Sequence, residues 1–360
     1  MSKPIGVGIV GANPERGWAH MAHIPALRTM PEFRIAAVST TNMESAKACA
    51  ATLPGSVPFD DSARMAEHPD VDLIAVTVKV PEHYRIAMTA IEAGKHVLCE
   101  WPLAIDTAQA ERLLAAARER GVRHFIGLQG RLSPTVAYIR DLIAEGYIGD
   151  LLSCSIIGSG LAWGAAIDRS NAYGLDPRNA ATLLTIPVGH LLDTLTSLLG
   201  PVGPVKASIA QRRTHTTIIE SGEVLPLETP DQVLIATSFG DGIPTSIHYR
   251  GGLSGATNLH WELNGTSGDL VVSAATGHVQ MSGLSLRGSQ GGPGSELQPM
   301  PVPQSYFEPE EASLAAEAAS VRRLYRLIAA DIADGTSRAP DFAAALRCHE
   351  MLDLVRAAAR

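Results

Sequence analysis

The stretch with most bearing on the fold is Gly94-Lys95-His96-Val97-Leu98-Cys99-Glu100-Trp101-Pro102-Leu103-Ala104. A glycine turn leads into a short apolar run, and a polar residue, an aromatic residue and a proline follow. A run of this length after a turn is typical of a buried strand. A helical pattern begins near Asp106. The stretch therefore predicts a strand that passes directly into a helix.

Apolar runs and helical patterns alternate on both sides of this stretch, through about the first 130 residues. Strands are expected at 6–10, 35–39, 73–78, 96–99 and 124–127, and helices at 43–51, 82–93 and 107–120. Such alternation predicts a parallel sheet covered by helices on both faces. A further helix, expected over 134–145, leads into a different pattern.

Strand-like segments predominate from residue 151 onward. They are expected at 152–159, 205–211, 232–238, 244–249, 260–263 and 269–272, with helices at 180–199, 309–333 and 340–359. Turn pairs such as Gly240-Asp241 and Ser267-Gly268 separate several strands, which favours an antiparallel sheet. The Gly- and Ser-rich segment 283–294 is expected to form a surface loop.

The composition excludes several classes of protein. The 360 residues are 46% hydrophobic and 18% charged, which suits a compact globular chain. A formal charge of -8, without any Lys/Arg run longer than two, argues against nucleic-acid and anionic-membrane binding. No apolar segment is expected to reach the roughly 18–20 residues that span a bilayer. Four scattered cysteines without CxxC spacing indicate a reducing, cytoplasmic setting, and no metal site is expected.

A glycine turn follows the first expected strand, in Gly11-Ala12-Asn13-Pro14-Glu15-Arg16-Gly17-Trp18. Dinucleotide sites need glycines for a tight turn and for close approach of the pyrophosphate, followed by a helix N-terminus. Gly11 fits the first role, and Asn13 stands at the second glycine position, where its tolerance of left-handed backbone would substitute. Gly17 comes one residue late. The pattern alone is weak, because a glycine turn after any buried strand looks similar.

The Glu100-Trp101-Pro102 step resembles the signature of the glucose–fructose oxidoreductase, inositol dehydrogenase and MocA family, whose members usually have Glu-Lys-Pro there. The resemblance implies an α/β fold with a Rossmann dinucleotide-binding domain over 1–130. It implies a second α/β domain over 131–360, with a largely antiparallel open sheet. The C-terminal helices of this domain are expected to pack back near the first domain. In the family the lysine lies beside the nicotinamide and helps to move the proton that accompanies hydride transfer. Trp101 occupies that position here.

Several other segments resemble one branch of this family, which includes the fungal galactose-regulon repressor. They are Gly17-Trp18-Ala19, 127–134, 145–150, Val188-Gly189-His190, 249–252 and 265–270. That repressor kept the dinucleotide fold but binds a transcriptional activator instead of turning over a substrate. The resemblance covers nearly the whole chain and leaves the activity open.

The expected helix near residue 190 aligns with the acid–base residues of the family. Its enzymes usually have an aspartate four residues before a histidine and another three residues after it. Ile186, His190 and Asp193 stand at these positions, so the upstream acid is missing. Histidine suits proton transfer near neutral pH, and residues three apart share a helix face. His190 is the candidate catalytic residue, oriented by Asp193, although a lone helix histidine is usually structural.

The motifs and the resemblance together predict the ligand contacts. The dinucleotide is expected to contact Gly11, Asn13, Gly17, Trp18, Ser39, Thr40, Val78, His83, Glu100, Trp101 and Gln129. The substrate is expected to contact Trp101, Arg131, Trp163, Tyr173, His190 and Asp193. The run Ser39-Thr40-Thr41-Asn42 has no acid for the ribose hydroxyls and no arginine, so NAD or NADP is expected, with a slight preference for NADP. A plain polar loop explains that run equally well.

Three functions are compatible with these features. The main hypothesis is an NAD(P)-dependent oxidoreductase that acts on a sugar-like, polyol-like or other cyclic alcohol or ketone. The alternatives are a catalytically silent NAD(P)-binding regulator or sensor that acts through a protein partner, and a redox-neutral NAD-dependent lyase or glycosidase. A homo-oligomer, dimer or tetramer, is expected through the second domain's sheet, because an exposed apolar face is costly in water.

Overall fold

The computed structural model describes residues 3–281, 283–291 and 294–359. The chain forms two compact units. The first comprises Met1–Gln129 and Pro309–His349, and the second comprises Gly130–Glu308 and Glu350–Arg360. The first boundary lies one residue before the expected one. The segment Pro309–His349, which the sequence placed in the second domain, is part of the first unit.

A six-stranded parallel sheet forms the centre of the first unit, with the order β3-β2-β1-β4-β5-β6. Its strands are β1 (Ile5–Val10), β2 (Phe33–Ser39), β3 (Val57–Phe59), β4 (Leu73–Val76), β5 (His96–Glu100) and β6 (His124–Gly127). The long apolar runs form strands because both faces of a parallel sheet are covered. The predicted Rossmann-type sheet is confirmed. Only β3 was not foreseen, because it has three residues and contains a proline.

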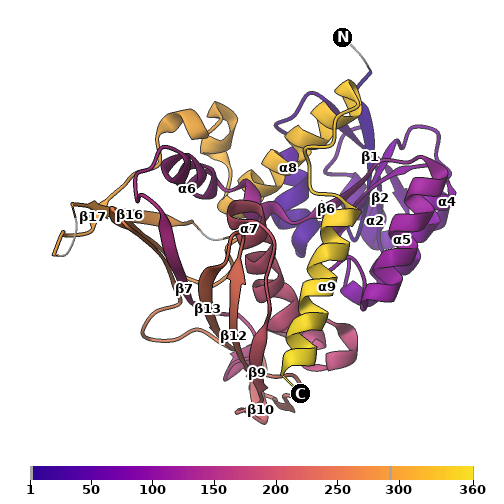
Figure 1. Cartoon of the computed structure of the whole chain (residues 1–360). Helices are drawn as coiled ribbons and strands as arrows, with labels where there is room; N and C mark the ends of the chain where they lie inside the picture. Colours follow the sequence, from indigo (N-terminus) through magenta and orange to yellow (C-terminus); the bar gives the residue numbers. More distant parts are fainter. Residues whose placement is uncertain (1–2, 282, 292–293, 360) are drawn as a thin grey trace. The chain divides into compact units, whose positions relative to one another are not determined.

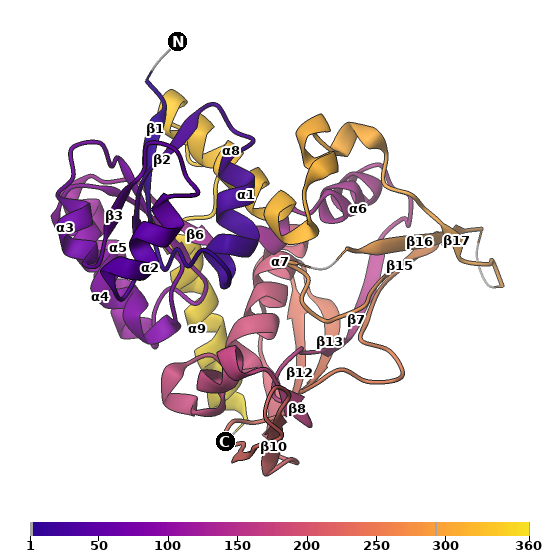
Figure 2. The same cartoon turned by 180° about the vertical axis from the view of Figure 1, so that it is seen from behind.

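Helices cover this sheet on both faces, since the connections run outward in both directions from the β1–β4 pair. The helical segments are a π-helix (Ala19–His23), α1 (Ile24–Leu27), α2 (Met43–Ala50), α3 (Ser62–Ala66), α4 (His83–Glu92), α5 (Thr107–Arg120) and α8 (Ala316–Asp334). Asn42 and Asp106 cap α2 and α5 through their side chains. α8 packs on α1 and on the π-helix, and this contact is why a late segment belongs to the first unit (α8 in Figure 1, α1 and α8 in Figure 2).

The second unit contains an eight-stranded sheet with the order β17-β16-β15-β14-β7-β13-β12-β9. Its strands are β7 (Leu151–Ser159), β9 (Lys206–Ala210), β12 (Gln232–Phe239), β13 (Ile243–Arg250), β14 (Leu259–Gly265), β15 (Gly268–Ala274), β16 (Ser285–Gln290) and β17 (Gln298–Pro299). Among the described strands of this sheet, β7 and β13 are the one parallel pair, so the predicted, largely antiparallel sheet is confirmed (Figure 2). β16 corrects the loop expected over 283–294, because its residues pair with β15 despite their glycine and serine content. Residues 292 and 293 lie outside the described residues.

The second unit also contains a small sheet of β8 (Ala166–Ile167), β10 (His215–Ile218) and β11 (Val224–Pro226), and helices α6 (Pro134–Ala144) and α7 (Gly189–Leu199). The residues of α9 (Phe342–Ala358) are divided after His349, with the first part in the first unit and the rest in the second. A π-helical turn, Leu184–Val188, precedes α7. Contrary to the sequence expectation, the stretch Pro177–Leu199 has the length and hydropathy of a membrane span, but 67% of its 18-residue apolar window is buried inside the protein, as in a core helix.

Candidate functional site

The expected dinucleotide turn begins at Gly11, where β1 ends. Gly11 has a φ of +94°, and an added Cβ would lie 2.9 Å from Val78 Cγ1 and 3.0 Å from the Thr77 carbonyl oxygen. The N–H groups of Gly11 and Ala12 donate to the Ser39 carbonyl at 2.8 and 3.3 Å, which joins the ends of β1 and β2. Glycine is required here both for its backbone conformation and for the space around it.

Asn13 has a different role from the one expected. The described non-glycine residues with positive φ are Trp163 and Ala180, so Asn13 does not replace a left-handed glycine. Its Oδ1 instead accepts hydrogen bonds from the N–H groups of Glu15 and Arg16, at 3.0 and 3.2 Å. Asparagine often stabilises turns in this way. The residues of this loop with positive φ are instead Gly11 and Gly17, at +94° and +88°.

The start of the first helix has donors available for an anion. Trp18 precedes the π-helix without capping it through its side chain, and the helical chain continues to Leu27. The indole Nε1 of Trp18 is buried and has no hydrogen-bond partner among the described residues. Free donors at a helix N-terminus favour negatively charged groups. This end of β1 therefore fits a dinucleotide phosphate.

The loop after β2 is already partly hydrogen-bonded. The Thr40 hydroxyl donates to the Asn42 carbonyl at 2.7 Å, and Asn42 Oδ1 accepts from the Ser45 N–H at 2.8 Å. Ser39 is buried. Residues 39–42 thus contain no carboxylate and lead into the N-terminus of α2, which favours an anion, whereas Glu44 in the first turn of α2 opposes one.

A buried chain of polar contacts holds Glu100. Its carboxylate accepts from His23 Nε2 at 3.0 Å, and the Tyr325 hydroxyl lies 2.8 Å from His23 Nδ1. Burial, followed by the charge of Glu100, raises the pKa of Tyr325, so this phenol stays protonated and donates to His23. At Gly127 a Cβ would lie within 2.7 Å of the Glu100 carboxylate. Sequence reasoning missed His23 and Tyr325, because 302 positions separate them.

Trp101 fills the position of the family lysine. It is 5% exposed, and its ring centroid lies 4.8 Å from that of His349. The ring therefore packs inside the first unit. His83 lies nearby and contacts the carbonyl oxygens of Pro102 and Val78 through its ring nitrogens, at 2.7 and 2.9 Å, which makes it a brace between two loops.

Gln129 ends the first unit with an unsatisfied group. It is 1% exposed, and its Oε1 has no partner among the described residues. A buried polar atom without a partner costs about 1–3 kcal/mol, so a bound group is the natural explanation. Gln129 Oε1 and Trp18 Nε1 are thus two buried polar atoms that a ligand is able to bond, and the residues present fit a dinucleotide.

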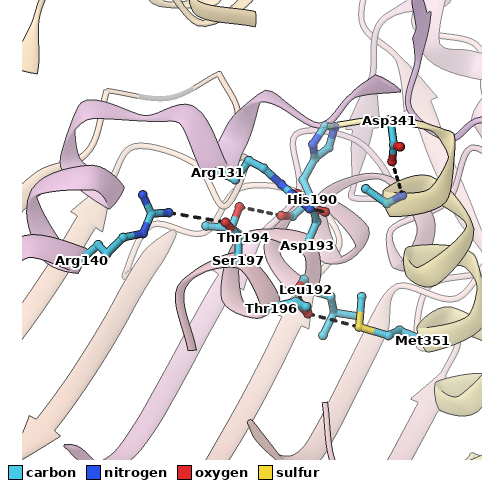
Figure 3. A network of polar contacts seen from close by, with 11 residues as sticks. Arg131, Arg140, His190, Leu192, Asp193, Thr194, Thr196, Ser197, Asp341 and Met351 are labelled. Carbon is cyan, nitrogen blue, oxygen red and sulfur yellow. Dashed lines mark hydrogen bonds and ion pairs between the residues drawn. The ribbon is translucent and has the colours of Figure 1, made fainter. Parts of the chain in front are cut away.

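Arg131 and Asp193 form an ion pair in the second unit (Figure 3). Arg131 Nε donates to Asp193 Oδ2 at 2.8 Å, and Nη2 donates to Oδ1. The side chains are 20% and 3% exposed. Figure 3 shows the His190 ring directed away from this pair. The expectation that Asp193 orients His190 is therefore wrong, because Arg131 holds the carboxylate.

His190 is buried, and its Nδ1 has no partner among the described residues. Burial, followed by the nearby His278, lowers the pKa of His190 to about 3. The imidazole is therefore neutral at physiological pH. His278 and its neighbour Gln280 are also buried. Sequence reasoning missed both, since no motif distinguishes the turn that follows β15.

The two aromatic residues expected at the substrate differ in their surroundings. Trp163 is 4% exposed, and its Nε1 donates to the carbonyls of Gly174 and Ala181, both at 3.2 Å. Its indole N–H is thus used to hold the loop between β7 and α7. Tyr173 is half-buried, and burial raises the pKa of its hydroxyl. Within the described residues, no three His, Cys, Asp or Glu side chains are grouped as a metal site requires.

Comparisons with known proteins agree with this architecture. Residues 5–128 match the model of the oxidoreductase family with an NAD-binding Rossmann fold, and residues 134–274 match the Gal80p C-terminal domain. The chain is 31% identical to the galactose/lactose metabolism regulatory protein GAL80 of Saccharomyces cerevisiae, over 79% of this chain and 70% of that protein. It is 34% identical to the dehydrogenase aclE of Aspergillus oryzae, over 76% and 77%.

A solved structure extends the similarity to the whole fold. The crystal structure of a super-repressor mutant of Gal80p from Saccharomyces cerevisiae is similar with a TM-score of 0.88 and 28% identity, covering 99% of this chain and 96% of that one. The chain therefore belongs to the glucose–fructose oxidoreductase, inositol dehydrogenase and MocA family, with an NAD-binding Rossmann domain and a C-terminal domain of the Gal80p type.

Proposed function

We propose that this protein is an NAD(P)-binding regulator or sensor, which acts through a protein partner and does not turn over a substrate. The observation that carries the proposal is the chemical state of the two positions that should move a proton. Trp101 replaces the lysine and is buried, and His190 has a pKa of about 3. The similarity to a galactose/lactose regulatory protein supports the same conclusion.

Hydride transfer from an alcohol needs a base for the hydroxyl proton, and the reverse reaction needs an acid. Efficient general acids and bases have a pKa near the working pH. One pKa unit corresponds to about 1.4 kcal/mol, so His190 accepts a proton with several kcal/mol less driving force than an ordinary histidine. Its protonated form is too scarce at neutral pH to serve as the acid. The carboxylate of Asp193 is bound by Arg131.

A second candidate is an NAD(P)-dependent oxidoreductase acting on a sugar-like or polyol-like alcohol or ketone. Its specific support is the unpartnered Nδ1 of His190, which is able to bond a substrate hydroxyl. The similarity to a fungal dehydrogenase also favours it.

In either function the dinucleotide, when bound, supplies a nicotinamide able to give or take hydride. Gly11, Trp18 and Gln129 would hold it, and the missing acid after β2 favours NADP slightly. The four cysteines are buried and form no disulfide among the described residues, which supports the proposed cytoplasmic location.

The two candidates are separated by measuring binding and turnover on the same purified protein. We expect calorimetry to detect NAD(P)(H) binding, with NADP(H) slightly tighter, and a screen of sugars, polyols and cyclic ketones to leave the reduced-nicotinamide absorbance unchanged. Addition of dinucleotide should then alter the protein's affinity for its partner. Turnover that falls by about 10²–10⁴-fold in His190→Ala, with dinucleotide binding intact, would establish the oxidoreductase instead.

We also propose a homo-oligomer formed through the outer face of the eight-stranded sheet. Leu234, His248 and Ile157 lie in one row across β12, β13 and β7, and the two aliphatic side chains are 44% and 40% exposed. The face is less apolar than the sequence suggested, because Ser155 and Ser246 share it. We expect light scattering at micromolar concentration to give a dimer or tetramer that Leu234→Lys/Ile157→Lys dissociates. The control Ile219→Lys, at a position 67% exposed, should leave the mass unchanged.

A further inference from the structure

The buried side chain of His278 has one defined protonation state. The backbone N–H of Leu161 points at its Nε2 at 3.1 Å. A backbone N–H only donates, so Nε2 must carry a lone pair. Burial lowers the pKa of His278 to about 4, and the ring is neutral. The single ring proton therefore sits on Nδ1.

This proton fixes the orientation of Gln280. One end of the Gln280 carboxamide lies 3.3 Å from His278 Nδ1, and the other end is buried without a partner among the described residues. The two ends are exchanged by a half-turn of the amide, and only the oxygen is able to accept the Nδ1 proton. The unpartnered end is consequently the NH₂ group. Gln280 thus holds two buried N–H donors that have no partner among the described residues.

His190 contributes a second unsatisfied atom to the same region. Its Nδ1 is buried and has no partner in the part of the chain that the structure describes, and His278 is close enough to lower the pKa of His190. Each such atom costs about 1–3 kcal/mol if it stays without a partner. Both histidines are neutral, and the charge of Arg131 is balanced by Asp193. The groups named here therefore offer hydrogen bonds and no net charge for an anion.

We propose that Gln280, oriented by His278, donates a hydrogen bond to an oxygen atom of an uncharged small molecule bound beside His190, and so determines which ligands the second unit accepts. Gln280 is the specificity-determining residue and His278 a positioning residue. The inference rests on the proposed function, because this molecule would be the signal that the sensor detects, or the substrate of the second candidate. A single buried water that bonds both groups is the competing explanation.

The test uses the full-length protein saturated with dinucleotide, with myo-inositol and D-glucose as uncharged probes and D-gluconate as the charged counterpart. We expect calorimetry to detect binding of at least one uncharged probe. The affinity for D-gluconate should be at least tenfold lower. Gln280→Glu keeps an acceptor for His278 but removes the N–H donors. It should lower the affinity for the uncharged probe by about 10–100-fold, since a lost hydrogen bond of this kind costs about 1–3 kcal/mol. Gln290→Glu, which adds the same charge at an exposed amide of this unit, should change it less than twofold.

Two further variants address folding and the role of His278. Should Gln280→Glu fail to fold, Gln280→Asn keeps the amide and withdraws it by one methylene, and the same loss is expected. His278→Leu should abolish the selectivity between the uncharged and charged probes, and His278→Gln should restore it. Dinucleotide affinity, measured in parallel, reports on the proposed function independently. Binding of no uncharged probe, or unchanged binding in Gln280→Glu, would overturn the inference in favour of the buried water.

Discussion

Replacing Asp193 by alanine is expected to lower the free energy of unfolding of the second unit by about 3–5 kcal/mol. The side chain of Asp193 is 3% exposed and accepts two hydrogen bonds from Arg131, which is 20% exposed. Removal of the carboxylate leaves a guanidinium largely shielded from water without its counter-charge. Such a loss exceeds that of a surface pair, which contributes about 0–1 kcal/mol. Urea denaturation followed by tryptophan fluorescence measures the difference.

Two controls distinguish the buried charge from a general effect of mutation. Arg356→Ala breaks the Arg356–Asp353 pair, whose side chains are 38% and 52% exposed, and should cost less than about 1 kcal/mol. The double variant Arg131→Met/Asp193→Leu removes both charges and should recover most of the stability, because apolar replacements of a buried pair are often neutral. A double variant as unstable as Asp193→Ala would show that packing, and not charge, accounts for the loss.

Gly11→Ala is expected to weaken dinucleotide binding by at least tenfold and to destabilise the first unit by about 2–5 kcal/mol. A left-handed backbone costs a residue with a Cβ about 1–2 kcal/mol, and overpacking against Val78 Cγ1 and the Thr77 carbonyl adds about 1–3 kcal/mol. Relief of this crowding would move the turn between β1 and the first helix, where the phosphates are expected. Titration with reduced nicotinamide dinucleotide, monitored by fluorescence, measures the affinity.

Gly55→Ala is the matched control for this variant. Gly55 also has a left-handed backbone, with a φ of +81°, but an added Cβ would meet no atom within 4 Å. Gly55→Ala should therefore lower the free energy of unfolding only by the backbone contribution of about 1–2 kcal/mol, and it should bind the dinucleotide with unchanged affinity. Equal affinities of Gly11→Ala and Gly55→Ala would remove Gly11 from the binding site.

The sequence predicted those features that depend on neighbours in the chain. Buried runs such as Val97-Leu98-Cys99 and caps such as Asp106 identify strands and helix starts within a few residues. The candidate site was less predictable, because its contacts join distant segments. Asp193 bonds Arg131, 62 positions away, and His278 bonds the Leu161 N–H, 117 positions away. Helical spacing paired Asp193 with His190, but spacing alone does not reveal that the side chain of Arg131 binds the Asp193 carboxylate.

The contact of Tyr325 with His23 has a consequence for the order in which the chain folds. Glu100, His23 and Tyr325 form one buried chain, so a nascent protein that has emerged only through β6 contains two of its three members. Its first sheet also lacks the apolar side of α8, which includes Val321, Leu324 and Ile328. During synthesis the N-terminal sheet therefore stays incompletely covered until α8 has left the ribosome. The dinucleotide-binding unit thus begins to form before the sheet of the second unit is made and is completed after it.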